Sequence, residues 1–368
     1  MNALRILLMA MLAAAPLRAE FEDLGTSARI VGLGGAGVAF TDDASALFLH
    51  PAGLTRTRMQ GLVAGYRRLD TGLTDGSVLW DGFAAYGHAF GPKWGTLAAG
   101  WQGFGLKEAY TEQTWAFGYG RLLQEKWGLI WSAGAAGLYR QKSIERDAYT
   151  DIDPLFQTNG RTRSAFDVSA GLGVERGALH AGLMWDRILR PSLSLDPGAE
   201  RLPTGVKAGV SYGAGRVRVG ADLGLQGRDV TGKTGVDLAL VPDRLNLRGG
   251  LGIGSRRFAQ VSAGVGILVR GYRLDYAAVF PLTGLRETHY THYVSVLVPF
   301  SGLWGSAAPP GVYVVKPGDT LPSIAAKPEI YGDASRWREI HGANKGILGG
   351  SFELYPGVQL VIPRETKR

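Results

Sequence analysis

The chain between residues 57 and 300 alternates apolar side chains with small or polar ones at a period of two. In the segment 216–226, for example, Val217, Val219 and Leu223 fall on one side of an extended backbone, and Arg218 and Asp222 fall on the other. An amphipathic helix would repeat its apolar positions every three or four residues, so this pattern predicts half-buried strands. Fourteen such segments occur, near 59–67, 78–89, 94–104, 111–122, 127–140, 163–174, 178–189, 202–212, 216–226, 233–241, 244–253, 257–269, 271–280 and 288–300.

No segment of the chain approaches the roughly 18 consecutive apolar residues of a membrane-spanning helix. A strand barrel crosses a membrane without such a run, because lipid-facing and lumen-facing residues alternate. The less apolar face is largely glycine, serine and alanine, which suits a crowded lumen, and the chain has 55 glycines in 368 residues. Trp127 and Tyr139 share the apolar face at a spacing of about 30 Å, close to the separation of two aromatic girdles.

The lengths of the connections give a second test. Long ones near 68–77, 141–162, 190–201, 227–232 and 281–287 alternate with short ones, except at the short link near 254–256. Outer-membrane barrels have long external loops, tight periplasmic turns and an even number of strands. The last strand closes on Phe300 after outward apolar alternation, which resembles the assembly signal of such barrels. We therefore expect residues 57–300 to form an outer-membrane β-barrel in contact with lipid, with a soluble all-β domain as the alternative.

Charged residues on the less apolar face are expected to line the lumen, where they pair with one another and with water. They are Lys207, Arg216, Arg218, Asp222, Arg248, Arg273 and Asp275. The chain contains neither of the catalytic motifs H-E-x-x-H and G-x-S-x-G, and no pair of carboxylates stands in a recognisable catalytic pattern. We therefore expect no enzymatic activity. The net charge of +8 is spread along the chain, so we expect no nucleic-acid partner.

Residues 1–19 are typical of a secretory signal peptide, with an apolar run from Leu7 to Leu17 and cleavage after Ala15 or Ala19. A buried N-terminal helix is the alternative. The chain contains no cysteine, which excludes disulfides, thiol nucleophiles, cysteine-based zinc sites and a lipoprotein anchor.

Residues 32–37 read GLGGAG and fit the pattern G-x-G-x-x-G. A dinucleotide site also needs a preceding strand, a following helix and an acidic residue about 20 positions later. At most Ala28 to Val31 could form a strand before Gly32, and no acidic residue lies between Ala44 and the first barrel strand. We therefore expect no nucleotide cofactor, and no metal.

Residues 27–54 carry a different signature, because 42–46 read DDASA and 51–54 read PAGL after the glycine-rich run. This segment resembles the N-terminal segment of FadL-type outer-membrane proteins, including the PorV/PorQ relatives. The resemblance implies that residues 20–56 fold inside the barrel as a hatch. His50 stands where the family usually has asparagine, and an ordinary glycine-rich lead-in is the alternative. The implied hatch positions are Asp42, Asp43, His50, Pro51, Ala52 and Gly53.

Residues 301–311, SGLWGSAAPPG, break the alternation and are expected to form a linker. The following residues 312–368 contain KPGDTL at 316–321, YGDASRW at 331–337 and YPG at 355–357. These motifs, in this order and spacing, resemble a LysM domain, a small α+β unit of strand, helix, helix and strand.

The LysM resemblance implies a periplasmic domain that binds N-acetylglucosamine-containing glycan, here peptidoglycan. The positions that it assigns to the glycan groove are Gly318, Asp319, Thr320, Leu321, Asn344, Leu354 and Tyr355. Helix capping alone is the alternative for Thr320 and Asn344.

The sequence thus predicts an all-β transmembrane barrel of about 14 antiparallel strands with an N-terminal hatch, followed by a LysM domain. The leading hypothesis is an outer-membrane channel or transporter for a hydrophobic or small solute, tethered to peptidoglycan. The alternative is a structural or secretion-associated barrel, similar to PorV, that engages a periplasmic or secreted protein.

Overall fold

The computed structural model describes residues 26–57, 60–69, 78–91, 93–195, 201–242, 244–269, 272–283, 290–300, 312–348, 352–355 and 357–363. The predicted signal peptide 1–19, the first part of the predicted hatch at 20–25 and the predicted linker 301–311 lie outside these residues.

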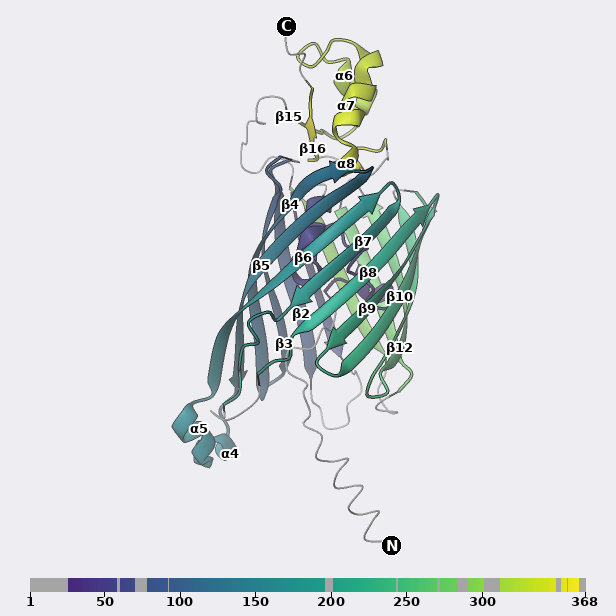
Figure 1. The fold of residues 1–368 in the computed structure, drawn as a ribbon. Coiled ribbons are helices and arrows are strands. Elements are labelled where there is room, and N and C mark those ends of the chain that lie inside the picture. The colour runs from purple at the N-terminus through teal and green to yellow at the C-terminus, as the bar shows by residue number, and fades with distance from the viewer. Residues whose placement is uncertain are drawn as a thin grey trace.

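Fourteen antiparallel strands close into a barrel (Figure 1). Each strand pairs with its neighbours in the sequence, and β1 pairs with β14 in the register Gly61↔Pro299 to close the sheet. The predicted all-β barrel of about 14 antiparallel strands is therefore confirmed. The strands are β1 (Gly61–Leu69), β2 (Leu79–Ala89), β3 (Thr96–Leu106), β4 (Tyr110–Lys126), β5 (Leu129–Ile144), β6 (Thr162–Arg176), β7 (Leu179–Asp186), β8 (Gly205–Ala214), β9 (Val217–Gln226), β10 (Asp229–Val241), β11 (Leu245–Gly254), β12 (Ala259–Val269), β13 (Tyr272–Pro281) and β14 (Thr291–Pro299).

The apolar face of the strands points outward. In β9, Val217, Val219, Leu223 and Leu225 are between 38 % and 52 % exposed. Gly220 of the same strand points inward, because a Cβ atom there would overlap the ring of a hatch phenylalanine. A shift of one residue in register would exchange the two faces, so the alternation specifies how the strands pair.

Aromatic side chains gather near both ends of the outer face. Towards the long loops, the rings of Trp115, Tyr139 and Phe166 pack against one another in a tilted arrangement across β4, β5 and β6, with centroids 5.7 and 5.1 Å apart. At the end with short turns, Trp94 and Trp127 are both exposed. Trp127 lies in the β4–β5 turn at φ 58°, not inside a strand as the sequence pattern suggested. Two such belts are typical of barrels that sit in a bilayer.

Residues 26–57 fold inside the barrel and are called the hatch here. They form α2 (Ala28–Gly32), α3 (Ala46–Leu49) and the 3₁₀ helix η1 (Pro51–Arg56). Helix α2 packs against β11–β14, whereas η1 packs against β3–β7, so the hatch bridges opposite walls of the lumen. Its largest buried apolar side chains are Ile30, Val31, Leu33, Val38, Phe40, Leu47, Leu49 and Leu54.

Two glycines of the wall are needed for the hatch to fit. A Cβ atom on Gly250 of β11 would overlap the backbone of Leu33 and Gly34. A Cβ atom on Gly134 of β5 would overlap the backbone of Pro51. Glycine therefore lets the hatch backbone approach the wall backbone closely, which explains part of the glycine excess.

The loop between β5 and β6 carries α4 (Ala148–Ile152) and α5 (Pro154–Asn159), at the end of the barrel opposite the C-terminal domain (Figure 1). The C-terminal domain contains β15 (Val312–Val314), α6 (Leu321–Ala325), η2 (Ala334–Arg336), α7 (Trp337–Ala343), α8 (Lys345–Leu348) and β16 (Gln359–Val361). Strands β15 and β16 pair antiparallel, so the order of strand, helices and strand matches the sequence pattern.

Capping and burial explain why the C-terminal domain folds this way. Thr320 and Ser323 form a reciprocal capping box at the start of α6. Asn344 is buried, donates to the carbonyls of Ile340 and Val361, and accepts from the Val361 N–H, each at 2.7 Å. This side chain therefore fastens the end of α7 to β16. The core around it includes Leu321, Ile324, Ile340, Leu348, Val358 and Leu360.

Candidate functional site

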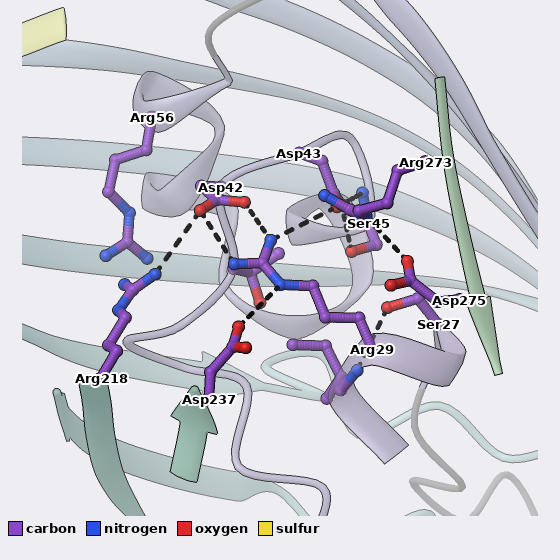
Figure 2. A network of polar contacts seen from close by, with 12 residues as sticks. Ser27, Arg29, Asp42, Asp43, Ser45, Arg56, Arg218, Asp237, Arg273 and Asp275 are labelled. Carbon is purple, nitrogen blue, oxygen red and sulfur yellow. Dashed lines mark hydrogen bonds and ion pairs between the residues drawn. The ribbon is translucent and has the colours of Figure 1, made fainter. Parts of the chain in front are cut away.

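Charged side chains from the hatch and the wall meet where the hatch crosses the lumen (Figure 2). Among the described residues we call eight of them the ionic cluster. The hatch supplies Arg29, Asp42 and Asp43, and the wall supplies Arg218 of β9, Asp237 of β10, Arg248 of β11, and Arg273 and Asp275 of β13. Four guanidinium groups and four carboxylates balance in formal charge.

Arg29 joins α2 to the middle of the hatch. Its guanidinium pairs with the Asp42 carboxylate through two hydrogen bonds, of which Nη2 to Oδ2 is 3.1 Å. Its Nε also lies 3.9 Å from Oδ2 of Asp237 on the wall. The side chain is 9 % exposed. A planar guanidinium suits such a site because it binds one carboxylate with two nitrogens and still reaches another.

Asp43 ties the hatch to β13. Its Oδ1 accepts from the N–H and hydroxyl of Ser45, and its Oδ2 accepts from Nη2 of Arg273 at 2.5 Å. Arg273 also donates from Nε to Asp275 at 2.7 Å, and Arg248 donates from Nη1 to Asp275 at 2.6 Å. The contacts run as a continuous chain from the hatch into the wall.

A second wall contact holds the glycine-rich loop of the hatch. Asp222 of β9 accepts the N–H of Gly37 at 2.6 Å and that of Val38 at 2.9 Å. On the same strand Arg218 donates to the Ala39 carbonyl at 2.9 Å. The N–H of Gly34 donates to Ser262 of β12 at 2.9 Å. The N–H groups of Gly34 and Gly37 in the G-x-G-x-x-G segment thus bind the barrel wall.

These contacts position the hatch more than they add net stability. Burying two charges costs free energy that their attraction only partly repays, whereas removing one partner leaves an uncompensated buried charge. The geometry of the pairs is specific, so the hatch has one preferred seat.

The hatch separates two cavities. The first, of about 690 Å³, lies towards the short-turn end between the ionic cluster and the C-terminal domain; the hatch lines it with Arg29 and residues 42–44. The second, of about 370 Å³, lies towards the long loops, where the hatch contributes Val31 and Gly35. Charged wall residues line this second cavity as well, among them Lys207 and Lys233. Both volumes are in the range of small-molecule pockets.

The remaining hatch residues singled out from the sequence serve as packing contacts. The imidazole of His50 has Nε2 3.0 Å from the Leu172 carbonyl and is seated against Gly171 and Gly182 of the wall. Gly53 packs against the α3 segment. The segment containing Pro51 and Ala52 lies against β5 and β6, so it anchors η1 to that wall.

The residues predicted to line the lumen do so with one exception. Arg216 lies in the turn before Val217 and is exposed, so it belongs to the rim of the barrel. Its position continues the inward parity of β9, but the strand begins one residue later. Sequence reasoning did not select Arg29 or Arg56 as site residues. The Ala-Arg pair at 28–29 was the available signal for Arg29.

The seven positions assigned to the glycan groove have three kinds of surroundings. Asp319, Thr320, Leu354 and Tyr355 line the first cavity. Leu321 is a core residue of the domain, and Asn344 is buried and fully used by backbone contacts. Neither offers a free group to a ligand. Gly318 has φ +84° and open space around it.

Within the described residues, no group of three or more His, Cys, Asp or Glu side chains could hold a metal ion. No helix of the same described residues is long and apolar enough to cross a membrane.

The fold is shared with solved outer-membrane channels. The toluene transporter TbuX of Ralstonia pickettii matches 75 % of this chain and 98 % of its own length, at 11 % identity and a TM-score of 0.52. The monoaromatic hydrocarbon channel CymD matches 76 % of this chain and 99 % of its own length, at 12 % identity and a TM-score of 0.54. The toluene transporter TodX of P. putida matches 75 % of this chain and 99 % of its own length, at 13 % identity and a TM-score of 0.52. The barrel therefore has the same fold as these transporters and channels.

No protein-family model matches the chain. A curated relative, the potassium binding protein Kbp of Escherichia coli O6:H1, is 43 % identical over 53 residues. That match covers 14 % of this chain and 34 % of the relative, so the chain spans about a third of the relative's length.

Proposed function

We propose that the chain is a bacterial outer-membrane channel for a hydrophobic or small solute, with its C-terminal domain in the periplasm. The observation that carries this proposal is the closed barrel with an apolar outer face, whose lumen holds a cavity on each side of an internal hatch. The proposal includes no enzymatic step.

The comparisons support the solute class. TbuX and TodX are named toluene transporters and CymD a monoaromatic hydrocarbon channel, and all three share this fold. The lining of both cavities mixes apolar side chains such as Leu297 and Val279 with charged ones. A small solute with both an apolar and a polar part fits such a lining better than a long, purely apolar one.

Reconstitution into liposomes tests the channel. Full-length protein is expected to accelerate the entry of toluene or of a small phenol into vesicles that contain a trapped reporter. Vesicles with heat-denatured protein, mixed at the same ratio, control for leakage. Entry rates equal to this control for apolar and polar probes alike would refute transport.

We further propose that the C-terminal domain is a LysM domain that tethers the barrel to peptidoglycan. The motifs at 316–321, 331–337 and 355–357 and the strand–helix–strand order support this. The solubilised full-length protein is expected to co-sediment with insoluble peptidoglycan, and soluble N-acetylglucosamine oligomers should compete. Sedimentation that such oligomers leave unchanged would refute glycan recognition.

A non-transporting barrel that engages a periplasmic or secreted protein, similar to PorV, is the second candidate. The ionic cluster favours it, because a neutral and tightly paired group of charges lies in the lumen between the two cavities. Identification of proteins that co-purify from gently solubilised membranes tests this candidate: a stoichiometric partner without solute entry would support it over the channel.

A further inference from the structure

The surface that the LysM resemblance assigns to glycan faces the barrel. Asp319, Thr320, Leu354 and Tyr355 line the first cavity together with hatch and wall residues of the ionic cluster. The exposed ring of Phe352 lines it as well. The predicted glycan groove therefore opens onto the first cavity, at the short-turn end of the lumen.

The C-terminal domain is seated on two separate parts of the barrel. Helix α8 packs against η1 of the hatch. Gln359 of β16 lies beside the β2–β3 turn, where a Cβ atom on Gly91 would be 3.6 Å from its Oε1. Figure 1 shows the domain directly over the short-turn end of the barrel. The domain thus contacts the hatch and the rim at once.

The groove loop keeps its shape through contacts within the domain. Asp319 Oδ2 accepts from the Tyr313 hydroxyl at 2.7 Å and from the Lys316 N–H at 2.8 Å. The Thr320 hydroxyl accepts from the Ser323 N–H in the capping box. None of these bonds depends on the barrel, so the loop can remain formed when the domain leaves its seat.

A glycan strand and the barrel compete for the same surface of the C-terminal domain. The cavity of about 690 Å³ has the size of a pocket for one small ligand, which is roughly 300–1,000 Å³. A peptidoglycan strand is a long polymer in the periplasm, and a groove that faces the hatch and the barrel wall across a space of this size leaves no room for it. Strand binding therefore requires that the domain leave the barrel.

We propose that the C-terminal domain is a displaceable cap on the short-turn mouth, and that binding of a peptidoglycan strand to its groove removes it. This inference rests on the proposed function. A ligand that binds only the unseated state shifts the equilibrium by its differential affinity. An interface between two domains of one chain is commonly a movable one. The tether and the cap would be one surface, so the mouth would be open more of the time where the barrel is attached to the cell wall.

Cross-linking tests this in the full-length chain, which contains no cysteine of its own. Thr55→Cys in η1 and Lys345→Cys in α8 place one thiol on each side of the seat. A short bismaleimide with a reducible centre joins them and can later be cut. The two single-cysteine variants, treated with the same reagent, serve as matched controls. Sedimentation with insoluble peptidoglycan and solute entry into liposomes are measured before and after cleavage.

We expect the cross-linked protein to lose sedimentation with peptidoglycan, and cleavage to restore it. We also expect soluble N-acetylglucosamine oligomers to raise solute entry through the cleaved protein and not through the cross-linked one. Undiminished peptidoglycan binding by the cross-linked protein would overturn the inference, as would failure of the two thiols to cross-link in intact vesicles. Sedimentation and solute entry of the untreated wild-type chain report separately on the tether and channel of the proposed function.

Discussion

Arg29 is the side chain whose loss should most loosen the hatch. Its guanidinium is 9 % exposed and pairs with Asp42 through two hydrogen bonds, with Asp237 within 4 Å. In Arg29→Ala the Asp42 carboxylate loses its bidentate partner and keeps Arg218, at 3.5 Å, as its ion-pair partner within the cluster. The variant therefore places uncompensated negative charge between the hatch and the wall.

The size of the effect follows from the burial of the pair. Truncating one partner of a buried, hydrogen-bonded charge pair costs about 2–5 kcal/mol. Asp42 is 28 % exposed to the first cavity, so the lower end of that range applies. The variant leaves the buried apolar contacts of the hatch in place, so we expect the hatch to stay seated but to detach more often.

Thiol labelling measures that detachment. Val38 is 3 % exposed against the wall, so Val38→Cys reports on opening of the hatch. A loss of about 2 kcal/mol raises the open fraction, and with it the labelling rate, about 30-fold, since each 1.4 kcal/mol is a factor of ten. Solute entry into liposomes should rise in parallel. The barrel strands are untouched, so the folded barrel should migrate unchanged in an electrophoretic heat-shift assay.

Two further variants separate the charge effect from a general loss of stability. Arg29→Ala with Asp42→Ala removes both partners and should recover part of the wild-type labelling rate. Arg161→Ala breaks an ion pair with Asp151 on an exposed loop and should change nothing, because exposed pairs contribute about 0–1 kcal/mol. Equal labelling rates in Arg29→Ala and Arg161→Ala would refute the role of the ionic cluster in holding the hatch.

Three other predictions address the seat of the hatch and the C-terminal domain. Gly250→Ala forces a Cβ atom into the hatch backbone and should speed Val38→Cys labelling, whereas Gly249→Ala, with open space around it, should not. Asn344→Ala leaves Val361 unpaired and should destabilise the C-terminal domain by about 2–4 kcal/mol, seen as faster proteolysis of that domain alone. Burial acts to raise the pKa of Asp319, but the hydrogen bonds that it accepts outweigh this and hold the pKa below its usual range. Its stabilisation is therefore present near neutral pH and lost as the pH falls through the lowered pKa; Asp319→Asn should flatten that acid dependence in intrinsic tryptophan fluorescence.

The barrel could be predicted from the sequence because alternation is a local signal repeated fourteen times. In β9, for example, the alternation within the strand is enough to identify its outward apolar face, whichever strands lie beside it. The end of an element is less well determined: Arg216 continues the inward parity but lies in the turn. Asn344 shows the same limit in the C-terminal domain. Its motif position is consistent with a ligand contact or a cap, and only the approach of β16 shows that the side chain is consumed by the fold.

The ionic cluster could not be assembled from the sequence, since its members lie between positions 29 and 275 and meet only when the barrel closes. Inward parity identified Arg218, Arg248, Arg273 and Asp275 individually, but parity contains no information about depth along the barrel. The hatch determines that depth: Arg29 and Asp43 approach the wall only at the level where α2 packs on β11–β14. The sequence therefore identifies charged residues of the wall but not the residues with which they pair.

The position of the cluster constrains how a solute could pass. A purely apolar solute offers no groups to replace the carboxylate–guanidinium bonds, so separating the pairs in its presence would cost the full desolvation of both charges. Passage must therefore leave the pairs intact, or move them as a unit with the hatch, or admit water along with the solute. The Arg29→Ala variant distinguishes these routes. If the hatch moves as a unit, its detachment and solute entry should rise by the same factor, whereas a path around an intact cluster would leave solute entry unchanged while labelling increases.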